Sequence, residues 1–169
     1  VISNTLEQQR QDFLLAERVI ELGNENAFLK LSSTLADYPL YPYLQYQWLK
    51  TNLSQTDKIL AFLSAYKDTR YAGLLRSKWL DYLAKNERWI EFILYYQASD
   101  NTALECQFYW AIYKVANRQL ALNEAKRLWV TGHSLPNECE PLLSALVLSP
   151  AFSPDLIWQR FELALKKDN

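Results

Sequence analysis

Apolar residues recur at helical spacing along nearly the whole chain of 169 residues. In a representative segment, residues 71–83, the bulky side chains lie three or four positions apart, at Tyr71, Leu75, Trp79 and Tyr82. Signals for strands are nearly absent, because the sequence has only three glycines and no Asn-Gly or Asp-Gly pair between alternating runs. The pattern therefore predicts an all-α fold.

Breaks in this periodicity divide the chain into about ten helices with short connectors. Gly23-Asn24 is typical of a helix end, and Pro39 and Pro42 disfavour helix for the residues before them. Helices joined this tightly prefer antiparallel pairing, and a series of such pairs makes a right-handed superhelix. We therefore expect one solenoid-like domain over residues 1–169, with degenerate repeats that do not fit the tetratricopeptide pattern.

Capping signals give the expected helix starts. Each start combines a polar residue with a helix-compatible first turn. The predicted caps are Ser54 with Asp57, Asp100, Asn137 with Glu140, and Ser153 before Pro154.

Composition excludes several classes of function. Half of the residues are hydrophobic and 22% are charged, which is typical of a globular protein. The formal net charge of −1 argues against a nucleic-acid or membrane-surface partner. The apolar runs are far shorter than the roughly 20 residues of a membrane-spanning helix, so we expect a soluble chain. It begins with Val1 and has neither methionine nor a signal peptide, so we expect a processed or truncated product.

The sequence predicts no catalytic, cofactor-binding or metal-binding residue. A zinc site needs three or four ligands, whereas His133 is the one histidine and follows a glycine in an expected turn. Retaining cleavage of a glycosidic bond needs carboxyl groups positioned in a cleft. The sequence has two pairs of neighbouring acidic residues that could be considered for this role. Their expected positions favour a solvated helix face for the first pair and a helix start for the second. These pairs are Glu17 with Glu21 and Glu138 with Glu140.

Aromatic residues gather around the proline break, and two interpretations stay open for them. They could stack on sugar rings, or they could lock the packing of the neighbouring helices. We favour packing. The residues concerned are Tyr38, Tyr41, Tyr43, Tyr46 and Trp48.

Cys106 and Cys139 are the two cysteines. An even number suits a disulfide in an oxidising compartment, but two free buried thiols are equally compatible with the count.

Two segments resemble a known family. Residues 37–44, DYPLYPYL, resemble the DYPLYPYLEY stretch of the soluble lytic murein transglycosylases of Gram-negative bacteria. Residues 128–139, LWVTGHSLPNEC, are similar to the LWLTGKSQPNAC segment of that family. The similarity in spacing extends over essentially the whole chain.

The resemblance implies a location in the periplasm and a place in the N-terminal superhelical ring of an enzyme whose lysozyme-like catalytic domain lies outside this chain. The whole enzyme would cleave the β-1,4 bond between N-acetylmuramic acid and N-acetylglucosamine in peptidoglycan, giving 1,6-anhydro products. Its acid is the glutamate of a Glu-Ser motif, and no glutamate here is followed by serine. We therefore expect a scaffold that is inactive alone and reaches glycan strands through the full-length enzyme.

The resemblance also implies a disulfide between Cys106 and Cys139. Two other functions remain open: a helical-repeat adaptor for a protein or peptide partner, and direct glycan binding by the tyrosines around the proline break.

Overall fold

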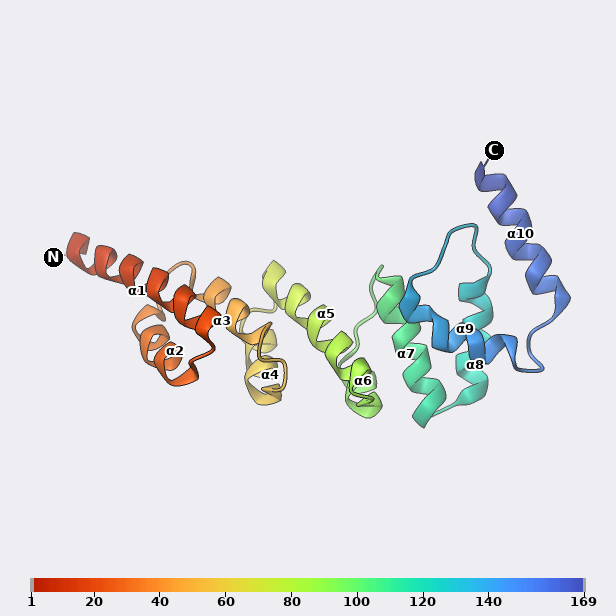
Figure 1. Cartoon of the computed structure of the whole chain (residues 1–169), viewed down its shortest axis with the longest axis horizontal. Coiled ribbons are helices and arrows are strands. Elements are labelled where there is room, and N and C mark those ends of the chain that lie inside the picture. Colours follow the sequence, from red (N-terminus) through yellow and green to blue (C-terminus); the bar gives the residue numbers. More distant parts are fainter. Residues whose placement is uncertain (1, 169) are drawn as a thin grey trace. The chain divides into compact units, whose positions relative to one another are not determined.

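The computed structural model describes residues 2–168, with side chains from residue 5 onward. These residues form ten α-helices and two short 3-10 helices without any strand (Figure 1). The prediction of an all-α fold with about ten helices is confirmed. No helix in the described range has the length and apolarity needed to cross a membrane.

The described residues form two compact units, which divide between Trp79 and Leu80 within helix α5 (Arg70–Lys85). The remaining elements of unit 1 are α1 (Ile2–Leu22), α2 (Glu25–Ser32), the 3-10 helix η1 (Ser33–Leu35), α3 (Tyr41–Leu49) and α4 (Thr56–Ala65). The remaining elements of unit 2 are α6 (Trp89–Tyr95), α7 (Thr102–Val115), α8 (Arg118–Trp129), the 3-10 helix η2 (Asn137–Cys139), α9 (Glu140–Val147) and α10 (Pro154–Asp168).

The turn between α1 and α2 follows its sequence signals. Gly23 has φ +70°, a conformation that glycine adopts without a steric penalty. The side chain of Asn24 then accepts a hydrogen bond from the backbone N–H of Ala27 (3.1 Å) and caps α2. The chain reverses here, so α1 packs against α2.

The proline break also lies where the sequence predicts it. The helical path stops after η1, and α3 begins again at Tyr41 with Pro42 in its first turn. A proline is tolerated there because the backbone N–H of this position has no partner within the helix.

In unit 2, α7 and α8 form a hairpin with a two-residue connection. Asn117 caps α8 by accepting a hydrogen bond from the N–H of Leu120 (3.0 Å). Small side chains let the helices approach, and the core they share with α9 consists of Cys106, Ala121, Ala125, Leu128, Cys139, Leu142 and Leu146.

An ion-pair network ties the same hairpin together on its surface. Arg127 of α8 pairs with Glu105 of α7 and, at 2.8 Å, with Glu124 of its own helix. Hydrogen bonds from the Arg127 guanidinium to these two carboxylates raise its pKa.

Three capping predictions are wrong. Asn101, not Asp100, caps α7, and its side chain accepts from the N–H of Leu104 (3.1 Å). Helix α4 starts after Gln55 without a side-chain cap, so the predicted cap at Ser54 is not made. The third predicted cap, Asn137, lies inside η2 instead of capping α9.

Candidate functional site

The aromatic residues around the proline break pack within unit 1. Phe13 of α1 lies 5.6 Å from Tyr38 and 6.2 Å from Tyr43, measured between ring centroids. Trp48 stacks on Phe28 at 4.7 Å and is only 2% exposed. These contacts join α1, α2 and α3 through their rings.

Tyr46 and Trp48 are held by further contacts. The Tyr46 ring lies 5.6 Å from that of Tyr71, and burial raises the pKa of the Tyr46 hydroxyl. The indole N–H of Trp48 donates to Oε1 of Gln55 (3.1 Å). Both rings are buried, whereas Tyr38, Tyr41 and Tyr43 are half-buried, so a sugar could reach only the latter group. Glycan contact by these three tyrosines stays a prediction.

The two cysteines form a disulfide between α7 and η2, the pairing that the family resemblance implies. Both residues are fully buried in the core of unit 2. The cross-link therefore fixes the start of α9 against the middle of α7.

The remaining candidates lie apart from one another on solvated surfaces. His133 is exposed in the loop after α8, and its backbone N–H donates to the hydroxyl of Thr131 (3.2 Å). Across the described residues, no group of three or more His, Cys, Asp and Glu residues is placed to hold a metal ion.

The acidic pairs show no arrangement for acid–base chemistry. Glu21 is exposed and lies 3.6 Å from Arg18, one turn earlier on α1. Glu138 and Glu140 are exposed on either side of the buried Cys139. Exposed carboxylates of this kind are typical of a solvated helix surface.

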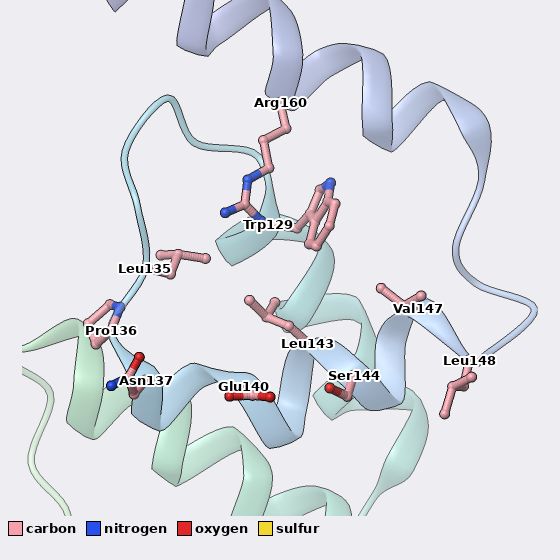
Figure 2. Close-up of a pocket in the computed structure, with 10 residues that line it drawn as sticks. All are labelled: Trp129, Leu135, Pro136, Asn137, Glu140, Leu143, Ser144, Val147, Leu148 and Arg160. Carbon is pink, nitrogen blue, oxygen red and sulfur yellow. The ribbon is translucent and has the colours of Figure 1, made fainter.

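Unit 2 contains a pocket of about 500 Å³ between α8, α9 and α10 (Figure 2). This volume falls within the range typical of small-molecule and cofactor sites. Its walls are mainly aliphatic, with a few polar groups at the rim. The lining residues are Trp129, Leu135, Pro136, Asn137, Glu140, Leu143, Ser144, Val147, Leu148 and Arg160.

One wall of this α8–α10 pocket is a fixed stack of Arg160 on Trp129. The guanidinium carbon lies 4.4 Å from the centre of the indole, a cation–π arrangement. The indole N–H donates to the carbonyl oxygen of Leu156 (2.9 Å), and the Phe152 ring packs perpendicular to the indole at 5.2 Å. Trp129 is therefore held in one orientation and positions Arg160.

Charge is distributed unevenly over the α8–α10 pocket. Figure 2 shows Arg160 reaching from α10 toward Trp129, while Glu140 lies at the start of α9 and Asn137 in the preceding η2. Within the described part of the chain, Arg160 makes no ion pair. Glu140 is placed in the first turn of α9, where the helix dipole favours a negative charge. The pocket therefore presents a cation and an anion on different elements.

The chain is similar to known proteins in its amino-acid sequence. No family model matches the chain. The soluble lytic murein transglycosylase of Salmonella typhimurium is 29% identical over 170 residues, which are 99% of this chain and 26% of the relative. That of Escherichia coli is 28% identical over the same shares.

Solved structures agree with the sequence comparison. The 70-kDa soluble lytic transglycosylase of Escherichia coli matches with a TM-score of 0.84 at 28% identity, over 96% of this chain and 27% of the other. The chain is related to the soluble lytic murein transglycosylases. The lytic transglycosylase Slt of Pseudomonas aeruginosa matches with a TM-score of 0.82 at 27% identity, over 94% of this chain and 26% of the other.

The chain spans about a quarter of the length of the soluble lytic murein transglycosylases that it matches. Because the match covers 99% of the chain, it includes both segments that carry the sequence resemblance, residues 37–44 and 128–139. The 70-kDa transglycosylase has also been solved in complex with bulgecin A, and that structure matches with a TM-score of 0.83 at 27% identity, over 96% of this chain and 27% of the other.

Sequence patterns did not predict the α8–α10 pocket. Glu140 drew notice only as a helix-start residue, and Trp129 only as part of a helical face. Arg160 lies between Trp158 and Phe161 on α10, and nothing in this local sequence marks it as a pocket residue. The pocket exists because these three helices meet.

Proposed function

We propose that the chain is a non-catalytic helical scaffold of a soluble lytic murein transglycosylase. In the whole enzyme, which acts in the periplasm, this single domain would help to guide peptidoglycan glycan strands beside a lysozyme-like catalytic domain located outside this chain. The observation that carries the proposal is the match of 99% of the chain to about a quarter of each curated relative.

The chemistry of the reaction supports a scaffold role. Cleaving the bond between N-acetylmuramic acid and N-acetylglucosamine to a 1,6-anhydro product requires one carboxyl group that acts first as an acid and then as a base. An enzyme raises the pKa of such a group by burial. Glu138 and Glu140 are exposed, and Glu21 is paired with Arg18, so the surroundings of these carboxylates do not favour that role.

An assay on purified murein sacculi tests the proposal. We expect the chain alone to release no anhydromuropeptides, while a full-length relative releases them under the same conditions. Removing this region from the full-length enzyme should slow its turnover of sacculi more than its turnover of short soluble glycan fragments. Release of anhydromuropeptides by the chain alone would contradict the proposal, as would equal turnover of sacculi with and without the region.

One surface favours the second candidate, an adaptor that binds another protein. Helix α10 has a row of exposed apolar side chains, of which Trp158 is 62% and Phe161 52% exposed. Replacing Trp158 and Phe161 together by serine in the full-length protein separates the two functions. A face that is covered inside the enzyme lowers the melting temperature when it is changed, whereas a face reserved for an outside partner leaves the melting temperature unaltered.

A further inference from the structure

We propose that the α8–α10 pocket binds a short peptide with a free carboxylate, which pairs with Arg160 while an apolar side chain rests on Leu143 and Val147. This proposal adds a ligand to the proposed function. It rests on that function only for the source of the peptide, since peptides join the glycan strands of murein. Peptide binding itself can be measured without murein.

The anion-binding end of the pocket is preorganised. The guanidinium carbon of Arg160 lies 4.4 Å from the centre of the Trp129 indole, which holds its N–H groups at the wall of the pocket. Arg160 makes no ion pair with any residue that the structure describes, so these donors are available to a ligand. A guanidinium fork matches the two oxygens of a carboxylate, and charge-assisted hydrogen bonds of this kind are among the strongest in proteins.

The contacts that hold Trp129 in place lower the conformational entropy lost when a ligand binds. The indole is fixed by its hydrogen bond to Leu156 (2.9 Å) and by the perpendicular Phe152 ring. A site that is ordered before the ligand arrives loses less conformational entropy on binding. The stack therefore offers a carboxylate a fixed position.

The body of the pocket suits an aliphatic side chain better than a sugar ring. Apart from Trp129, the lining contains no aromatic residue, and its largest apolar members are Leu135, Leu143 and Leu148. The one indole is covered by Arg160 on a face and packed by Phe152, so it offers no open platform for a pyranose ring. Apolar contact is favourable in proportion to the area removed from water, which leucine-like side chains supply.

The opposite rim completes the match to a peptide. Glu140 begins α9, and the amide of Asn137 lies in η2 directly before that helix. A carboxylate and an amide there can accept hydrogen bonds from peptide N–H groups, while Arg160 takes the carboxylate. Charge complementarity along the pocket thus sets the direction of the peptide.

Titration calorimetry with two matched peptides tests the proposal. The probe is acetyl-alanyl-leucine with a free carboxylate, and its control is the same peptide with a C-terminal amide. We expect the free acid to bind roughly tenfold or more tightly than the amide, since a charge-assisted pair is lost in the amide. No binding at about 10 mM acid, or equal binding of the two peptides, would overturn the assignment.

Two arginine variants locate the interaction on the chain. Arg160→Gln should weaken binding of the acid roughly tenfold and abolish its preference over the amide. Arg118→Gln is the matched control, because Arg118 also lies over an aromatic ring in unit 2, 5.1 Å from the centre of Tyr113, but does not line the pocket. An equal loss in both variants would overturn the assignment. Because the peptide pair needs no variant, the proposal stays testable even if Arg160→Gln misfolds.

A soluble glycan tests whether the pocket binds a sugar instead of a peptide. Chitotetraose, a soluble tetramer of N-acetylglucosamine, should not displace the peptide, and competition between them would contradict a peptide site. If the peptide binds but the sacculi assay fails, the pocket assignment stands and murein is removed as the source of the ligand. If the sacculi assay succeeds and the peptide does not bind, the scaffold stands without this site.

Discussion

Gly132 lies against the carbonyl group of Leu163, so closely that a Cβ on Gly132 would be 2.7 Å from the carbonyl oxygen and 3.0 Å from its carbon. Both atoms belong to the backbone of α10, which cannot swing aside as a side chain can. We therefore expect Gly132→Ala to destabilise unit 2 by about 1 to 3 kcal/mol, the usual range for overpacking. Urea unfolding followed by circular dichroism measures the change.

Gly73 provides the matched control for this substitution. It is an exposed residue of α5, and nothing beyond its own helix backbone lies within 4 Å of the position that a Cβ would take. Because alanine favours helix over glycine, Gly73→Ala should leave stability unchanged or raise it by roughly 0.5 to 1 kcal/mol. Equal effects of the two substitutions would show that the contact between Gly132 and Leu163 is not tight.

Reducing the disulfide should lower the free energy of unfolding. The cross-link joins residues 33 positions apart, and loop-closure entropy predicts a loss of about 3.5 to 4 kcal/mol. Unfolding curves with and without reductant measure it. In a variant with both cysteines replaced by alanine, the reductant should have no effect. If the reductant lowered the free energy of unfolding of that variant as well, the loss would have a cause other than the disulfide.

The cap of α7 can be tested one residue at a time. Asn101→Ala removes the hydrogen bond to the N–H of Leu104 and should cost about 1 kcal/mol. The neighbouring Asp100 is exposed, and the structure gives it no capping bond, so Asp100→Ala should stay within roughly 0.5 kcal/mol of the parent. A larger loss of stability in Asp100→Ala than in Asn101→Ala would indicate that Asp100 caps α7, as the sequence pattern predicts.

Alkaline pH should destabilise the fold through four tyrosines, of which Tyr46 is buried and the others are half-buried. Burial raises the pKa of the hydroxyls of Tyr46, Tyr66, Tyr96 and Tyr109. A group with a raised folded-state pKa contributes its full stability below the unfolded pKa of about 10 and loses it as the pH rises through the folded value. Urea midpoints should therefore fall above about pH 10. Phenolate absorbance should show a late-ionising fraction in the native chain that disappears in urea.

Local signals in the sequence located the helix boundaries best where a single residue type has a strict conformational preference. Gly23 ends α1 because it adopts a positive φ, and Pro39 lies in the non-helical segment before α3, whose first turn contains Pro42. These effects act within a few residues, so the sequence alone contains them.

Capping residues were harder to assign because neighbours compete for the same task. Asp100 and Asn101 are equally good caps by type, and the path of the chain before α7 decides in favour of Asn101. At the start of α9, η2 takes in Asn137, and the disulfide at Cys139 constrains the same segment. Packing of the surrounding core thus overrides a local preference.

The α8–α10 pocket could not be predicted from the sequence, for a different reason. Trp129, Leu143 and Arg160 lie on three helices, and each looks ordinary on its own helix. Only the way α10 meets α8 and α9 places the guanidinium on the indole. Such an arrangement depends on crossing angles and loop paths, which periodicity does not specify.

The bond between Cys106 and Cys139 encloses the exposed stretch around His133 and Ser134. Exposed loops of this kind are where proteases most often cut a folded chain. A single nick there would not separate the two pieces, since sulfur still links them across the core. Unit 2 can thus be clipped in this loop without shedding a fragment, until a reductant releases it.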